Sequence, residues 1–165
     1  MSYQPKVYRE QGGNKIVIAS GGEIEIQSGA TLDIQSGATM SQSGVPAGAS
    51  FSIGTESSDI IVVGIQLNDG AGVALANRAA VTVYLSDDAN GDAIASATPS
   101  GTVGAGTDGL VMPSGGDSKK LFTCVSEADG DIDLSIEDTA GSTYYVAVVL
   151  PNGKLSVSGA VTFAT

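Results

Sequence analysis

An eight-residue unit is repeated three times near the start of the chain, between residues 16 and 39. The copies read IVIASGGE, IEIQSGAT and LDIQSGAT, and a fourth decays after its first residues. Aliphatic residues at alternate positions share one face of a strand, and the Ser-Gly step suits a sharp bend. A strand and a corner at a short fixed period predict a β-helix or related β-coil. A meander of three short strands with similar turns is the alternative.

Three copies make roughly one turn of a triangular coil, which has nothing to stack on within one chain. The aliphatic side chains of the repeated face bury too little surface to offset the cost of ordering three copies. Three chains wound around one another would supply the missing layers. We therefore predict a homotrimer with a threefold axis along the coil. Its core would be formed by Ile16, Ile18, Ile24, Ile26, Leu32 and Ile34.

The chain divides into four zones: an arm at 1–14, the repeat at 15–41, a linker or collar at 42–57 and a domain at 58–165. In the last zone, runs of β-branched residues alternate with turns rich in Gly, Asn and Asp, and no amphipathic helix of useful length occurs. This pattern predicts an antiparallel β-sandwich, with a barrel as the alternative. The domain resembles an immunoglobulin-like or similar β-sandwich only in general terms, and the lack of tryptophan and of a cysteine pair argues against a true antibody-type domain. The fold class is therefore all-β, with an arm and an intertwined trimeric repeat ahead of the sandwich.

Individual elements of this domain can also be predicted. Residues 59–67 and 80–86 each predict a strand, and residues 96–118 predict a long loop around one short strand. Residues 120–137 predict a hairpin around EADGD, and residues 143–164 predict a closing hairpin around PNG.

Charge is distributed unevenly along the chain. The net charge is −11, but three cations against one acid give the first fifteen residues +2, which leaves −13 for the other 150. This acidity argues against nucleic-acid binding and against an anionic membrane as a partner. A basic arm on an acidic body suggests docking on an acidic neighbour, with Tyr3, Lys6, Tyr8 and Arg9 as anchor candidates. Alternatively, these cations have no role.

Few residues of the chain can support catalysis or hold a metal. Histidine is absent and Cys124 is the single cysteine, so triads, histidine metal sites and CxxC zinc sites are excluded. Oxygen-rich turns occur at EADGDID and DDANGD, and they read either as hairpin tips or as calcium loops that lack the EF-hand pattern. We predict no catalytic, cofactor-binding or metal residue and no enzyme. A paired-carboxylate glycosidase is a distant alternative.

The N-terminus MSYQPKVYREQGG has no apolar segment typical of a signal peptide. No run of eighteen apolar residues predicts a transmembrane helix either. We therefore expect synthesis in a host cytoplasm, with action elsewhere if the protein leaves by lysis.

The stretch YQPKVYREQGGNKIVIASGGEIEIQSGATLDIQ resembles the start of small virion proteins of tailed bacteriophages. The resemblance covers about the first forty residues. It implies a head decoration (cement) or head-fibre protein on the capsid surface, usually trimeric, which binds the major capsid protein with one end. A tail fibre carrying the acidic β domain is the alternative.

Two classes of function follow. The first is a structural virion protein without catalysis, and the second is a module whose sandwich recognises a host-surface glycan or protein. Recognition surfaces are usually rich in exposed Tyr, Trp and Arg. Here only Arg78 and the pair Tyr144-Tyr145 qualify, and alternation along a strand buries one of those tyrosines. This favours the structural protein.

Overall fold

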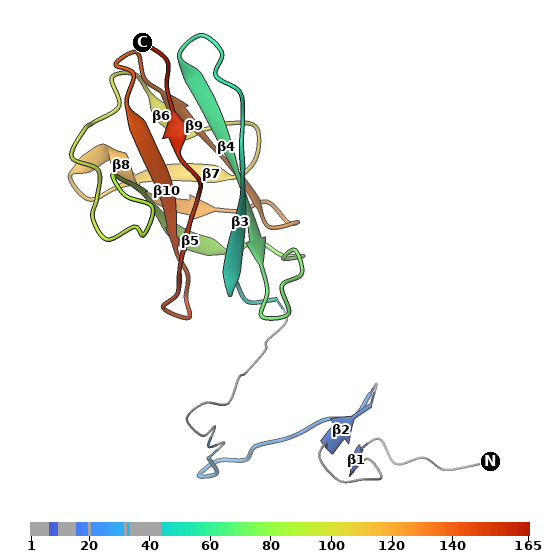
Figure 1. The fold of residues 1–165 in the computed structure, drawn as a ribbon. Helices are drawn as coiled ribbons and strands as arrows, with labels where there is room; N and C mark the ends of the chain where they lie inside the picture. Colours follow the sequence, from blue (N-terminus) through green and yellow to red (C-terminus); the bar gives the residue numbers. More distant parts are fainter. Residues whose placement is uncertain (1–6, 10–15, 20, 32, 34–43) are drawn as a thin grey trace. The chain divides into compact units, whose positions relative to one another are not determined.

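The structure is a computed structural model that describes residues 7–9, 16–19, 21–31, 33 and 44–165. The chain forms two compact units, Met1–Thr39 and Met40–Thr165. Each unit is considered by itself below. The described residues contain strands, turns and bends but no helix (Figure 1).

The N-terminal unit contains one antiparallel pair of strands. Strand β1 (Val7–Arg9) pairs with β2 (Ile16–Ile18), with Tyr8 opposite Val17. The predicted arm therefore contributes a strand to the first copy of the repeat. The two predicted zones, 1–14 and 15–41, join through backbone hydrogen bonds at this point.

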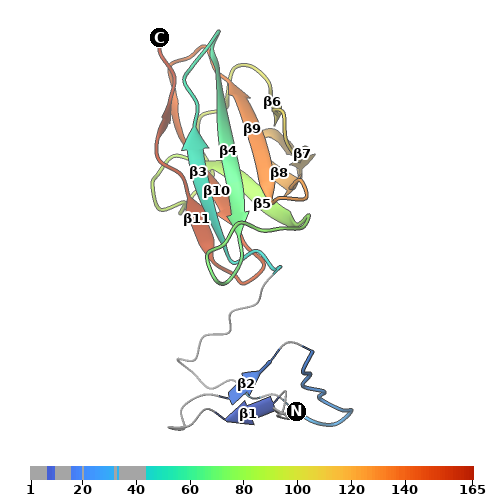
Figure 2. The same cartoon turned by 90° about the vertical axis from the view of Figure 1, so that its right-hand side faces the viewer.

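The C-terminal unit is a sandwich-like arrangement of two antiparallel sheets (Figures 1 and 2). One sheet has the order β3-β4-β9-β6, and the other has the order β11-β10-β5-β8-β7 with β12 also paired to β10. The strands are β3 (Gly48–Ile53), β4 (Ile60–Asn68), β5 (Ala80–Ser86), β6 (Val103–Ala105), β7 (Leu110–Ser114), β8 (Asp117–Val125), β9 (Asp131–Glu137), β10 (Thr143–Val149), β11 (Leu155–Val157) and β12 (Val161–Thr162).

The core lies between the two sheets and follows from alternation along the strands. In β4, every second residue from Ile61 to Leu67 is buried, and its neighbours are more exposed. Strands β5 and β9 alternate in the same way. Tyr144 and Phe163 meet edge to face in this core, with 6.3 Å between ring centroids. The all-β prediction is confirmed, and so are the predicted bounds of β5 and the pairing of β10 with β11.

The hairpin predicted at 120–137 is wrong, because β8 and β9 belong to different sheets. The turn between them carries the chain from one layer to the other. The carbonyl of Gly130 accepts a hydrogen bond from the amide of Leu67, at 2.9 Å, which ties the turn to β4. The DG step was read correctly as a turn, but a turn of this kind does not specify whether its two strands pair.

The predicted collar at 42–57 is wrong for residues 48–53, which form β3 at the edge of the sandwich. The half-buried Phe51 packs against the core from this strand. The neighbours of Phe51 in this strand are mostly Gly, Ala and Ser, which have a low preference for strands. A prediction based on β-branched residues therefore misses β3. The loop predicted at 96–118 contains the short strand β6 in addition to β7, which corresponds to the one short strand predicted there.

Candidate functional site

The aliphatic side chains of the repeat are exposed in the single chain. Ile16, Ile24 and Ile26 keep 69%, 67% and 47% of their surface accessible. These three residues occupy the first and third positions of the repeated unit, so their exposure follows the repeat.

The other predicted trimer-core and anchor positions are only partly described. Ile18 is half-buried within β2. Leu32, Ile34, Tyr3 and Lys6 lie outside the described residues.

The remaining anchor candidates, Tyr8 and Arg9, have their backbones in β1. Tyr8 is opposite Val17 and Arg9 is opposite Ile16. The structure therefore brings two anchor candidates next to the first copy of the repeat, which the sequence alone did not indicate.

Two consecutive copies of the repeat end in the same turn. In residues 19–22 and 27–30, the amide of the fourth residue donates to the carbonyl of the first, at 2.8 and 3.0 Å. The third residue is glycine in both turns, with φ of 73° at Gly21 and 85° at Gly29. Positive φ at this position favours glycine strongly. The predicted corners are therefore present in the first two copies.

The second copy has its corner but not its strand. Ile24 and Ile26 lie in backbone that is assigned to no strand. A strand needs a neighbour to accept and donate its hydrogen bonds. Within the described part of one chain, the repeat does not form a stacked coil.

Carboxylates gather on the body at the turn before β9. Glu127 forms an ion pair with Arg78. The Asp129 carboxylate accepts from the amide of Asp131 at 3.3 Å, and the Asp133 carboxylate accepts from Thr107 at 3.2 Å. Only the Asp129 contact caps the backbone of the turn itself. The contacts of Glu127 and Asp133 tie the turn and β9 to distant segments of the chain.

The pKa of Asp131, the first residue of β9, is raised above its ordinary value. Burial raises its pKa most, and the hydrogen bond from Ile132 acts in the opposite direction. The nearby charges of Asp133, Asp108 and Asp129 raise the pKa further, because like charges disfavour ionisation.

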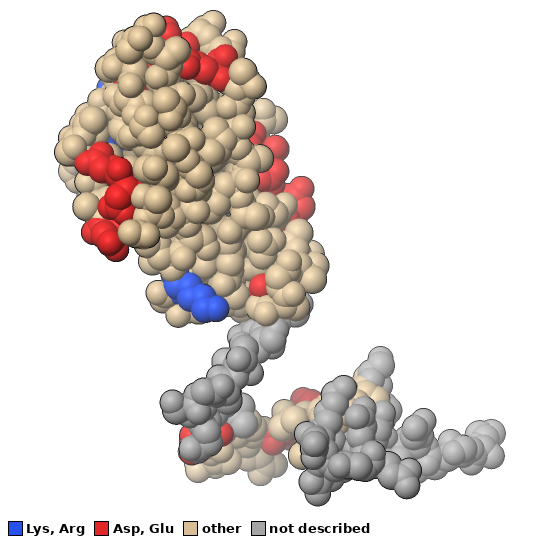
Figure 3. Space-filling view, viewed as in Figure 1, with Lys and Arg blue, Asp and Glu red and all other residues tan. Residues whose placement is uncertain are grey.

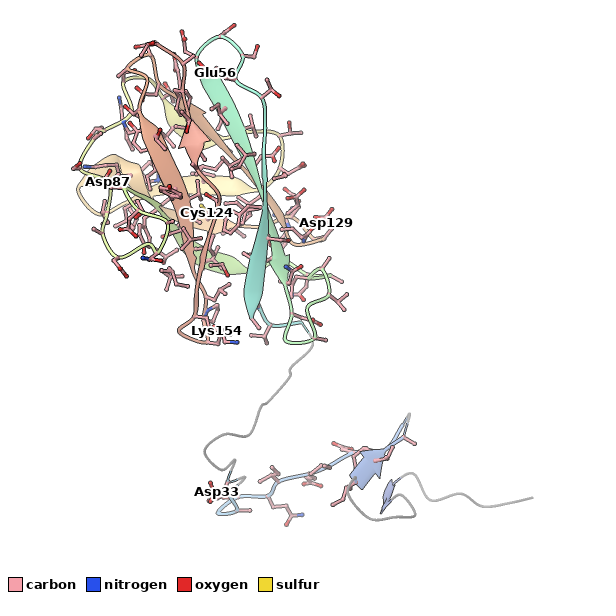
Figure 4. All side chains as sticks on the ribbon, in the orientation of Figure 1. Asp33, Glu56, Asp87, Cys124, Asp129 and Lys154 are labelled. Carbon is pink, nitrogen blue, oxygen red and sulfur yellow. The ribbon has the colours of Figure 1, made fainter. Side chains whose placement is uncertain are left out.

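A hollow of about 620 Å³ lies beside this turn. Its lining combines the apolar residues 74–76 and Ala128 with the carboxylates of Asp108, Glu127 and Asp129. In Figure 4, Asp129 marks this side of the body, with Asp87 on the opposite side. Figure 3 shows acidic residues on both sides.

The second acidic turn follows β5. Asp88 accepts from the amides of Asn90 and Asp92, at 2.8 and 3.4 Å. Asp87 accepts from the amide of Ser96 at 2.8 Å, and hydrogen bonds from Ser96 lower the pKa of Asp87. Across the described residues, no group of three or more His, Cys, Asp or Glu is placed to hold a metal.

Cys124 lies in the centre of the body (Figure 4) and is fully buried. Burial raises the pKa of its thiol to about 12. A thiol in this environment stays protonated at neutral pH, so it is a poor nucleophile. Cys124 is therefore a small core residue of β8.

One buried polar network was not found from the sequence. Asp138 is completely buried, and its carboxylate accepts from the amides of Ser100 and Ala140 and from the hydroxyl of Tyr144, at 3.1 to 3.2 Å. Burial acts to raise the pKa of Asp138, but hydrogen bonds from Ser142, Ser100 and Ala140 together lower it to about 2. The network stabilises the corner before β10.

No family model, curated protein or solved structure matches this chain. In the part of the chain that the structure describes, no helix is long and apolar enough to cross a membrane.

Proposed function

We propose that the chain is a structural virion protein of a tailed phage, without catalytic activity. It acts as a homotrimeric capsid decoration or head-fibre protein, anchored by its N-terminal unit to the major capsid protein. The observation that carries this proposal is the exposure of Ile16, Ile24 and Ile26 in a compact unit separate from the body. One chain leaves these side chains in water, and three intertwined chains would bury them.

The paired corners support this interpretation. Two turns with the same hydrogen bond and the same glycine conformation lie eight residues apart. The segment between them belongs to no strand in one chain. Neighbouring chains can supply both the hydrogen-bond partners and the apolar contacts that this segment lacks.

The order of the strands supports an immunoglobulin-like body. The orders β3-β4-β9 and β11-β10-β5 correspond to strands A-B-E and G-F-C of that fold. Tyr144 lies near the start of β10, and its hydroxyl donates to Asp138, six residues upstream. A tyrosine at the corresponding corner bonds upstream in immunoglobulin domains, there to the backbone. The hairpin β7–β8, inserted after β6, departs from the usual order.

The predicted anchor is supported by the place of β1. Tyr8 and Arg9 lie beside the first copy of the repeat, so arm and repeat can act as one attachment unit. The basic arm would meet the capsid, and the acidic body would project outward. Electron microscopy of particles with labelled protein would show whether the attachment is to the head or to the tail.

The trimer is tested with Ile26→Asp. We expect sedimentation velocity to show a trimer for the wild type and monomers or aggregates for the variant, since three symmetry-related charges would be buried together. Gln27→Asp adds the same charge at the next residue and should leave the trimer intact. If Ile26→Asp sediments as the wild type does, the intertwined repeat is refuted.

A second candidate function, recognition of a host glycan or protein, is favoured by the acidic hollow. Its volume of about 620 Å³ is within the range of ligand sites, and its carboxylates could accept hydrogen bonds from sugar hydroxyls. A glycan array with the full chain tests this function. A specific signal that is lost in Asp108→Ala would place recognition ahead of the structural role.

A further inference from the structure

The outer face of the five-strand path β11-β10-β5-β8-β7 carries a row of uncharged side chains. Directly opposite residues in antiparallel strands point to the same side. Pairing therefore places one residue of each strand in a single row, which consists of Leu155, Val149, Thr82, Thr123 and Met112. Leu155, Val149 and Met112 each keep about 40% of their surface exposed.

A second row runs beside the first. Ala80 is opposite Val125, which is opposite Leu110. Leu110 is half exposed, at 50%. We refer to the eight residues of these two rows as the uncharged face.

Two cations near the uncharged face have partners. Arg78, two residues before β5, is paired with Glu127. The ammonium of Lys119, on β8, donates to the carbonyls of Pro99 and Ser100, at 3.0 and 3.2 Å. None of the eight residues of the uncharged face is charged, and the exposed Lys154 lies at its border, next to Leu155 in the chain.

The outer face of the other sheet differs sharply. There Asp133 is opposite Gly64, which is opposite Ser52, and Asp131 occupies the same side of β9. This face is polar and acidic, as expected of a surface that meets water. The inner faces of both sheets consist of buried apolar side chains. The two sheets therefore differ in the polarity of their outer faces.

The uncharged face also contains a hollow of about 280 Å³ around Thr82 and Thr123, bordered by Val149 and Pro151. This volume is below the usual range of ligand pockets. It suits an apolar side chain of a neighbouring protein better than a separate ligand.

The size of the uncharged face limits what can bind it stably. Five strands about 4.8 Å apart and two rows about 7 Å apart cover on the order of a few hundred Å². A stable interface between free partners needs about 800 Å² on each side. Binding through this face alone would be weak, so its partner must be held nearby by other contacts.

We propose that the uncharged face turns toward the threefold axis and contacts the same face of the other two copies in the trimer. This inference rests on the trimer under "Proposed function". Eight residues separate Thr39 from the start of β3, a reach of at most about 29 Å. Three bodies on such short tethers have a high effective concentration, which makes a small interface sufficient.

Electrostatics favours this face over the others. Each chain carries a net charge of −11, so copies of the body repel one another. Any charge at a threefold axis is repeated three times at short range, where like charges cost most. The uncharged face is a side of the body that three acidic copies can bring together without that cost.

The proposal is tested by pyrene labelling of the full chain at Thr82→Cys, with Ser52→Cys as the matched control. Both residues are exposed and lie on the outer faces of opposite sheets, and the native Cys124 is buried and escapes the label. We expect excimer emission from the Thr82 label and only monomer emission from the Ser52 label. Monomer emission from both labels, in a protein that sediments as a trimer, overturns this inference and leaves the proposed function intact.

A second measurement does not depend on the label. Thr82→Lys and Ser52→Lys change the net charge equally, and we expect only Thr82→Lys to weaken the trimer, by at least tenfold in the concentration of half-dissociation. Equal midpoints for the two variants would refute contact through the uncharged face. A wild-type chain that is monomeric at all concentrations would refute both the inference and the trimer.

Discussion

At the scale of single residues, the corner before β10 depends on one buried carboxylate. Within the body, the Asp138 carboxylate accepts hydrogen bonds from two backbone amides and from the Tyr144 hydroxyl. Its partner Ser100 is 38 residues away along the chain. The sequence predicted that one tyrosine of the pair 144–145 is buried, and Tyr144 is. It could not indicate Asp138 as the partner, because a distant loop completes the site.

Asp138 should make stability depend on pH. Its pKa falls from 3.8 to about 2 in the folded chain. A lowered folded pKa means that the ionised form stabilises the fold above about pH 4, and that this contribution, about 2 kcal/mol, is lost as the pH falls toward 2. Asp138→Asn should lower the unfolding free energy at pH 7 and remove this part of the acid dependence. Urea unfolding followed by circular dichroism at several pH values measures both effects.

The control for this prediction is Asp92→Asn, which removes a charge from an exposed turn. Its unfolding profile should follow that of the wild type. An Asp138→Asn variant that keeps the wild-type acid profile would show that the network does not govern stability below pH 4.

At the scale of elements, strands with a strong alternating pattern were predicted well and short strands were not. The bounds of β5 were predicted correctly, β4 is shifted by one residue at each end, and β9 begins one residue earlier than predicted. Strand β6 has three residues and only one buried side chain, Val103. Local alternation shows which side chains face inward, but it does not specify which of two sheets a strand joins. The misread hairpin at β8 and β9 has this cause.

The crossing between β8 and β9 should be sensitive to an added methyl group. Gly130 has φ of 86°, and a Cβ there would lie 2.8 Å from the Leu75 Cβ and 2.9 Å from its carbonyl oxygen. Gly130→Ala should therefore lose stability from both backbone strain and overlap, about 2–4 kcal/mol in total. Gly72 has φ of 78° but nothing within 4 Å of an added Cβ. Gly72→Ala should lose only about 1 kcal/mol.

Thermal unfolding of the two alanine variants separates backbone strain from steric overlap. Both variants have the strain, so the difference between their melting temperatures reports the overlap with Leu75. Equal melting temperatures for both variants would mean that the crossing adjusts freely. The turn would then contribute little to holding the two layers together.

At the scale of the whole molecule, the sequence predicted the all-β class and the contrast between a basic arm and an acidic body. The sequence also predicted a corner in each copy of the repeat, and the structure contains the corners of the first two copies. The rest of the N-terminal site is incomplete in a single chain. Among the described residues, the exposed isoleucines have no apolar surface covering them, and residues 24–26 have no neighbouring strand. In the proposed trimer, the other two chains would supply both.

The arm should be separable from the fold if only residues 2–6 are removed. This deletion takes away Tyr3 and Lys6 but keeps β1, which pairs with β2. We expect a folded protein whose binding to capsids lacking the native protein is weakened at least tenfold, since three arms would bind together in the proposed trimer. Co-sedimentation with such capsids gives the measurement. A Gly-Ser replacement of the same length is the control for chain length.

Binding that equals the full-length protein would place the anchor elsewhere in the N-terminal unit. Arg9→Glu, within β1, tests that region next. Loss of the trimer on deleting residues 2–6 would instead show that the arm helps to build the coil.

The two identical corners have a consequence for how such a chain can change in evolution. They recur after eight residues, so a chain that gains or loses one whole copy keeps the corners at their regular spacing. An insertion that is not a whole number of copies would break the eight-residue spacing of the corner glycines. Duplication of 24 nucleotides could thus lengthen the N-terminal unit by one step while the body that follows stays unchanged. In the proposed virion protein, the length of the anchoring unit would then be a quantity that selection can adjust in whole steps.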